Sequence, residues 1–261
     1  METVRIDRDT RGVATLWLTR AEKRNAMSGE MIAELGEAAR TLAADDVVRA
    51  VVLAAEGDVF CAGGDLKWMQ AQMAADEATR RREATALAMM LKVLNKLPKP
   101  LIGRVHGNAF GGGVGLMSVC DVVVANEGTK FGLTETRLGL IPATIGPYVI
   151  ARIGEGRARR VFMSSQLFDV EEAVDLGLVA KVVSPGALDG AVEAEVAPYL
   201  ECAPGAVAEA KALARRLGGG VSDADIAASI DALMTRWASE EALEGTSAFF
   251  EKRKAGWMTG A

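Results

Sequence analysis

Short apolar runs alternate with longer stretches of helical periodicity over roughly the first 183 residues. Brief apolar runs are typical of buried strands, whereas apolar positions that recur every three or four residues indicate amphipathic helices. These segments are, in order, residues 13–18, 28–42, 51–54, 76–97 and 101–105. Ser28 offers an N-cap for the first predicted helix, and Pro98 and Pro100 end the second. The alternation predicts an α/β fold with right-handed crossovers.

Beyond Pro185 the pattern becomes helical throughout. The predicted helices cover residues 187–200, 206–217, 222–238 and 240–252, and three consecutive glycines separate the second from the third. We therefore predict two regions, with residues 1–185 as an α/β core and residues 186–261 as an all-helical C-terminal region.

Two glycine-rich segments, residues 60–66 and 107–115, each follow one of the apolar runs. Glycine lets the backbone approach a ligand closely and adopt positive φ, so two such loops can direct bare N–H groups at one oxygen atom. Two converging donors stabilise negative charge that develops on a carbonyl oxygen. The pair suggests an oxyanion hole, with Gly64 and Gly112 as its donors.

Glycine-rich loops also bind the phosphates of nucleotides. The second loop lacks the Gly-Lys-Ser/Thr ending of a P-loop and the G-x-G-x-x-G spacing of a dinucleotide fold. Nucleotide-phosphate binding is therefore disfavoured. The remaining alternative is structural: Gly111, Gly112 and Gly113 would simply allow a helix to pack tightly on a strand.

Five ordered segments match a known family. They are residues 23–27, 60–67, 107–115, 131–142 and 249–254, and through them the chain resembles the crotonase, or enoyl-CoA hydratase/isomerase, superfamily over nearly its whole length. The resemblance implies a core of repeated ββα turns wound as a superhelix, followed by a helical region that builds a homotrimer or a dimer of trimers. It implies acyl-CoA thioester substrates, with coenzyme A as part of the substrate and no separate cofactor.

The resemblance also implies roles for individual residues. The thioester oxygen would lie between the amides of Gly64 and Gly112, Gly112 would begin a helix, and Glu135 would be catalytic. The implied substrate and coenzyme A contacts are Arg24, Ala26, Ala62, Gly64, Asp65, Leu66, Lys67, Gly112, Phe249 and Lys252. Asp65 would support its loop, and the last helix would cover the coenzyme A of a neighbouring subunit. For Phe249, Phe250 and Lys252, an ordinary amphipathic helix is the alternative.

The chain departs from typical hydratases at one carboxylate. Hydratases of the family carry two glutamates, and here Glu135 supplies the second while Gly115 stands at the position of the first. Glycine can neither orient water nor carry a proton. A carboxylate beside an apolar acyl pocket has a raised pKa and suits proton transfer at carbon. The alternative for Glu135 is a surface residue that starts a helical turn.

A second resemblance concerns the substrate. Residues 139–148, together with residues 112–116, are similar to bacterial methylglutaconyl-CoA hydratases and to relatives that act on carboxylated terpenoid chains. The distal carboxylate of such a substrate would be bound by Arg137, by Tyr148 or by a substrate-held water.

Three functions stay open: hydration of a branched enoyl-CoA such as 3-methylglutaconyl-CoA, double-bond isomerisation by one glutamate, and acyl-CoA binding by a weakly catalytic trimer. Thioester decarboxylation, which needs only the oxyanion hole, also survives.

Charge and composition disfavour several classes of binding partner. The net charge of −5 and the dispersed basic residues disfavour nucleic-acid binding, and no apolar run is long enough to span a bilayer. The N-terminus lacks the features of a signal or transit peptide, so a cytoplasmic location is expected. Cys61, Cys120 and Cys202 lack the spacing of a disulfide framework or a zinc site, and no metal is expected. Cys61 is expected to be a small buried residue, and the sole histidine, His106, a non-catalytic loop residue.

Overall fold

The computed structural model describes residues 1–258, so residues 259–261 of the predicted C-terminal region lie outside it. Its main sheet has six strands in the order β1-β2-β3-β4-β6-β9, in which β1 is antiparallel to β2 and the other pairs are parallel. These strands are β1 (Val4–Arg8), β2 (Val13–Leu18), β3 (Ala50–Ala55), β4 (Leu101–Val105), β6 (Val122–Asn126) and β9 (Lys181–Val183). The parallel sheet confirms the predicted α/β class.

A second, smaller sheet shows the repeat that the sequence hides. It joins β5 (Ala109–Phe110), β7 (Lys130–Gly132) and β8 (Phe168–Asp169), and isolated parallel bridges link Met27 to Gly64 and Cys61 to Ala109. Each turn of the chain thus adds a strand to the main sheet, then a short paired segment beside the previous one, then a helix. This is the ββα repeat that the resemblance implied.

The helices agree with the predicted ones within a few residues at each end. The α-helices are α1 (Gly29–Ala44), α2 (Leu66–Ala74), α3 (Glu77–Asn95), α4 (Gly112–Ser118), α5 (Gly146–Ile153), α6 (Glu155–Ser164), α7 (Val170–Asp175), α8 (Leu188–Leu200), α9 (Pro204–Leu217), α10 (Asp223–Trp237) and α11 (Glu240–Phe250). The short 3₁₀ turns are η1 (Ala21–Lys23), η2 (Glu135–Leu138), η3 (Pro185–Ala187) and η4 (Gly256–Met258). Ser28 caps α1 by accepting the amide of Met31, as predicted.

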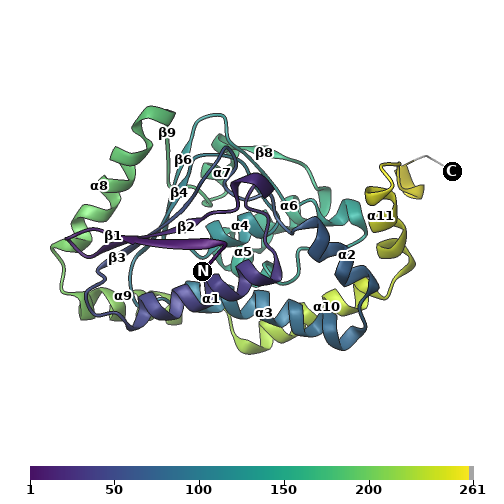
Figure 1. Ribbon diagram of the computed structural model, residues 1–261, viewed down its shortest axis with the longest axis horizontal. Helices are drawn as coiled ribbons and strands as arrows, with labels where there is room; N and C mark the ends of the chain where they lie inside the picture. Colours follow the sequence, from purple (N-terminus) through teal and green to yellow (C-terminus); the bar gives the residue numbers. More distant parts are fainter. Residues whose placement is uncertain (259–261) are drawn as a thin grey trace.

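The main sheet is covered on both faces, which explains its continuous apolar strands. In β3 the side chains of Val51 and Leu53 pack with α1 and α3, whereas Val52 faces α8 on the other side. Figure 1 shows α8 standing apart from α1, α3 and α10, which run along the opposite side of the sheet. The C-terminal helical region was expected to build an assembly of chains, yet its first helix, α8, covers a face of its own chain's sheet.

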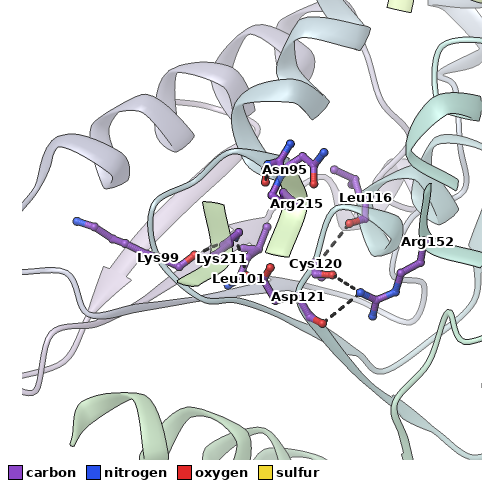
Figure 2. Close-up of polar contacts among 9 residues, drawn as sticks. All are labelled: Asn95, Lys99, Leu101, Leu116, Cys120, Asp121, Arg152, Lys211 and Arg215. Carbon is purple, nitrogen blue, oxygen red and sulfur yellow. Dashed lines mark hydrogen bonds and ion pairs between the residues drawn. The ribbon is translucent and has the colours of Figure 1, made fainter. Parts of the chain in front are cut away.

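Helix α9 is attached to the core through polar side chains. Figure 2 shows its Lys211, whose ammonium donates to the carboxylate of Asp121 at 2.7 Å and to the Lys99 carbonyl oxygen at 3.0 Å. The same Asp121 carboxylate accepts the amide of Leu101, the first residue of β4, at 2.8 Å. This shared carboxylate joins α9 to the starts of the interior strands β4 and β6, whereas α9 itself has no buried side chain. Within residues 1–258, no helix is long and apolar enough to cross a membrane.

Candidate active site

Two adjoining cavities lie where the glycine loops meet. The inner cavity has a volume of about 140 Å³ and extends between α2, α3 and α10. The outer cavity has a volume of about 450 Å³ and extends toward α11. The residues that line both cavities are Gly64, Met69, Gly112, Glu135 and Leu138. Three of the five are the residues for which catalytic roles were predicted, so the structure brings the predicted centre together.

The backbone pairing around Gly64 explains why its N–H makes no hydrogen bond with another backbone group. In the bridge to Met27, the carbonyl of Gly63 accepts the Met27 amide at 2.7 Å, and the amide of Asp65 donates to the Met27 carbonyl at 3.0 Å. Because neighbouring amides of an extended chain point to opposite sides, the Gly64 N–H is directed away from this bridge. Asp65 then caps α2 by accepting the amides of Lys67 and Trp68.

Each of the three consecutive glycines, Gly111, Gly112 and Gly113, meets a different structural requirement. Gly112 is the first residue of α4, so its N–H has no partner within the helix. Gly111 adopts φ +49°, a conformation that favours glycine, and it lies against the Glu135 carboxylate. A Cβ on Gly113 would come within 2.7 Å of the Cys61 carbonyl oxygen. The tight-packing interpretation therefore holds for Gly113, while Gly112 lines the cavities and begins a helix as expected.

Glu135 is not the surface residue of the alternative interpretation. It follows β7, begins η2, and is partly exposed to the cavities, but its Oε2 is inaccessible to solvent and has no hydrogen-bond partner among the described residues. Loss of solvation raises the pKa of Glu135 to about 7, against a small opposing effect of its own backbone amide. Such a carboxyl can both take and return a proton near neutral pH.

Gly115, the position of the absent second glutamate, lies behind the wall of the site. It is buried in α4, and a Cβ there would come within 2.6 Å of the Ile145 Cγ2 atom. Ile145 lines the inner cavity, whereas Gly115 does not. An isoleucine therefore occupies the space that a side chain at residue 115 would need. The absence of the carboxylate can be read from the sequence, but this replacement cannot, because Ile145 is thirty positions away along the chain.

One known family matches nearly the whole chain. The family model described as enoyl-CoA hydratase/isomerase matches residues 8–260. The chain belongs to the enoyl-CoA hydratase/isomerase family. It is therefore an enzyme of the class that acts on acyl-CoA thioesters.

Individual relatives cover nearly the whole chain. A crotonyl-CoA hydratase of Syntrophomonas wolfei is 33% identical over 252 residues, which make up 95% of this chain and 95% of that protein. The crystal structure of an enoyl-CoA hydratase from Mycobacterium smegmatis has a TM-score of 0.80 at 38% identity and covers 98% of this chain and 99% of that one. For an enoyl-CoA hydratase from Mycobacterium avium, the TM-score is 0.87 at 30% identity, with 98% and 99% covered. The predicted crotonase fold is confirmed.

Two residues proposed to bind a distal carboxylate are not placed for it in this family member. The hydroxyl of Tyr148 is buried and donates to the Ala88 carbonyl oxygen at 2.8 Å, so Tyr148 ties α5 to α3. Arg137 lines the outer cavity and not the inner one. The charged residue of the inner cavity besides Glu135 is Arg80, from the first turn of α3. Sequence reasoning missed it because Arg80 is one of three consecutive arginines in an otherwise ordinary helix.

The ten predicted substrate and coenzyme A contacts fall into three groups. Gly64 and Gly112 line both cavities, whereas Ala62, Leu66 and Phe249 line only the outer one, together with Arg253. The others lie outside both linings: Arg24, Ala26, Asp65, Lys67 and Lys252. Helix α11 ends at Phe250, two residues earlier than predicted, and Lys252 follows it with φ +55°. The structure thus places α11 at the cavity of its own chain.

The cysteine and histidine of the loops are not candidates for chemistry. Cys61 is fully buried, and loss of solvation raises the pKa of its thiol to about 12. The Nε2 of His106 lies 2.7 Å from the Gly57 carbonyl oxygen, and burial lowers the pKa of the ring. Neither residue lines the two cavities. Both expectations from the sequence are consistent with this placement.

The raised pKa of Glu135 predicts a cost in stability. A carboxyl with a pKa of 4.5 in the unfolded chain and about 7 in the folded one binds its proton more tightly when folded, so folding weakens as the pH rises from 4.5 through 7. Glu135→Gln removes this titration. The free energy of unfolding of the variant minus that of the unmodified protein should increase by about 2 to 3 kcal/mol between pH 5 and pH 8. Urea denaturation at both pH values measures it, and an advantage independent of pH would contradict the raised pKa.

Proposed function

We propose that this enzyme hydrates a short, branched, carboxylated enoyl-CoA, with 3-methylglutaconyl-CoA as the substrate. The observation that carries the proposal is that Gly64, Gly112 and a desolvated Glu135 line the same two joined cavities. The similarity of residues 139–148 to methylglutaconyl-CoA hydratases supports the acyl group. The coenzyme A moiety would extend through the outer cavity, past Phe249 and Arg253.

In this proposal the amides of Gly64 and Gly112 hold the thioester oxygen as it gains negative charge, and the N-terminus of α4 adds a favourable dipole. Glu135 accepts a proton from water while the water oxygen bonds to C3 of the enoyl group. The electron pair of the double bond moves to form the enolate. Glu135 then returns the proton to C2, which restores both the thioester carbonyl and the carboxylate. One carboxyl suffices because its pKa of about 7 lets it act in both directions.

The size of the inner cavity favours a short acyl group. Its volume of about 140 Å³ is close to that of an apolar protein cavity that holds benzene, about 150 Å³. An acyl chain of a few carbons with one branch fits this space, whereas a long terpenoid chain does not. Between the carboxylated substrates suggested by the sequence, the cavity therefore supports 3-methylglutaconyl-CoA.

The second candidate function is a double-bond isomerase with Glu135 as the only base. The observation in its favour is that Ile145 closes the wall where hydratases of the family carry their other glutamate. An isomerase would take a proton from C4 and return it to C2 of the same enolate, with no water consumed. Proton NMR of the products in D₂O distinguishes the two reactions, because only hydration forms a 3-hydroxyacyl-CoA.

We further propose that the enzyme assembles as a trimer or a dimer of trimers. Supporting this, α9 buries no side chain in its own chain, and Leu213 and Leu217 are 51% and 74% exposed. Met163 and Ile150 add apolar surface on α6 and α5, beside a hollow that also borders α10. Multi-angle light scattering should give a mass of three or six chains, and a fully active monomer would contradict the assembly.

Glu135→Gln should lower turnover of 3-methylglutaconyl-CoA by at least about a hundredfold, because it removes the only proton carrier of the mechanism. Coenzyme A binding should change little. In the unmodified enzyme, kcat/KM for hydration should rise with pH through a midpoint near 7, since the carboxylate is the form that accepts the proton. Glu127→Gln, at an exposed position after β6, is the matched control. A Glu135→Gln enzyme that keeps its activity would contradict the single-base mechanism.

Restoring the second carboxylate requires two substitutions. Gly115→Glu alone should fold poorly, because Ile145 fills the space for its side chain. Gly115→Glu combined with Ile145→Ala makes room for the carboxylate and should raise the rate of crotonyl-CoA hydration by about tenfold or more. A well-placed acid–base group contributes about a hundredfold at the low end, and a newly introduced one is expected to reach only part of this. Loss of enoyl absorbance measures the rate, with Ile145→Ala as control. An unmodified enzyme that hydrates crotonyl-CoA as fast as methylglutaconyl-CoA would contradict the substrate assignment.

A further inference from the structure

Arg80 lines the inner cavity without a carboxylate partner. Of the residues that line this cavity, only Arg80 and Glu135 carry charge, and Glu135 also borders the outer cavity whereas Arg80 does not. No ion pair or carboxylate hydrogen bond of Arg80 occurs within residues 1–258. Arg80 thus lines a part of the inner cavity that the outer cavity does not share, and the outer cavity is where the proposed function places coenzyme A.

The contacts of Arg80 leave part of its donor capacity unused. Its Nε donates to the Gln72 carbonyl oxygen at 2.7 Å and its Nη2 to the Met73 carbonyl oxygen at 2.8 Å, both near the end of α2. The guanidinium carbon lies 5.2 Å from the centre of the Trp237 ring on α10. These contacts fix the plane of the guanidinium. Its Nη1 makes no hydrogen bond with the described residues.

The acidic side chains nearest to Arg80 along the chain have other partners. Glu83 accepts the indole N–H of Trp68 at 3.1 Å and lies 3.7 Å from Arg82. Asp76 caps α3 by accepting the amide of Thr79, and its charge interacts with Arg82 and Arg80 only through space, without an ion pair. By contrast, the neighbouring Arg81 is exposed and pairs with Asp231 and Glu77. Arg80 thus differs from the next two arginines of the helix in facing a cavity instead of a carboxylate.

A fixed, half-buried guanidinium with unused donors is a site for an anion. Arginine binds carboxylates through two parallel hydrogen bonds, and such charge-assisted bonds are stronger in a partly apolar cavity than in water. Most other side chains that line the inner cavity are apolar, such as Leu87, Leu233 and Ile145, and the neutral polar ones are Gln72 and Thr144. A neutral acyl chain would leave the guanidinium desolvated and unpaired, which is unfavourable.

We propose that Arg80 binds a carboxylate at the distal end of the acyl group and is the residue that selects dicarboxylic over monocarboxylic acyl-CoA. Glu135 would then face the enoyl carbons and Arg80 the chain end, on opposite ends of one cavity. This inference rests on the proposed function for the identity of the site, and it adds the residue that determines substrate class.

Binding can be tested without turnover, so that this proposal and the proposed reaction fail separately. Isothermal titration would compare glutaryl-CoA with pentanoyl-CoA, which carries a methyl group in place of the distal carboxylate. The unmodified enzyme should bind glutaryl-CoA about tenfold to a hundredfold more tightly, as expected for a hydrogen bond to a charged group. Equal affinities would overturn the role of Arg80, whatever the enzyme catalyses.

Variants assign the preference to one side chain. Arg80→Met should abolish the preference for glutaryl-CoA and leave pentanoyl-CoA affinity within about threefold, since only the charged contact is lost. Arg80→Gln, which keeps an amide donor for the end of α2, should give the same result and serves if the methionine variant does not fold. Arg82→Met, on the exposed side of the same helix, should keep the full preference. A folded Arg80 variant that retains the preference would overturn the proposal.

Discussion

The site depends on the pairing between short segments of successive ββα turns. Met27 pairs with Gly64, Cys61 with Ala109, and Phe110 with Gly132, so three glycine-containing segments lie side by side in parallel. In the middle segment both sets of backbone groups are used, since the amide of Phe110 donates to Cys61 and that of Gly111 donates to Gly132. In the first segment the pairing with Met27 leaves the Gly64 amide without a backbone partner among the described residues, and Gly64, Gly112 and Glu135 line the same cavities. The geometry of the candidate site thus depends on strand register.

This register explains how much the sequence could predict. Glycine-rich loops after apolar runs are local patterns, and so are the capped and proline-bounded helices, so the class of fold, the helix limits and the pair formed by Gly64 and Gly112 followed from them. Glu135 was identified only through the family resemblance. The repeat itself was not legible, because each short paired segment contributes only two or three residues. Family resemblance supplied it, and the bridges confirm it.

Contacts between distant residues could not be predicted in the same way. Nothing local indicates that Ile145 fills the space beside Gly115, that the Tyr148 hydroxyl is used by the Ala88 carbonyl, or that Arg80 faces a cavity. Each depends on how α3, α4 and α5 pack against one another, which helical periodicity leaves open. The tail was misjudged for a related reason: an apolar helix face such as that of α8 does not reveal whether it covers its own sheet or a neighbouring chain.

The inner cavity holds two unmatched charges, and this makes sense only with a ligand. Glu135 has an oxygen with no partner, and Arg80 has an unused nitrogen. A protein selected for stability alone would pair such groups or replace them with apolar ones. On the proposals above, the acyl chain separates the two charges and completes both: its reacting carbons exchange a proton with Glu135, and its terminal carboxylate meets Arg80. The instability of the empty cavity is then available as binding energy for one chemical class of substrate.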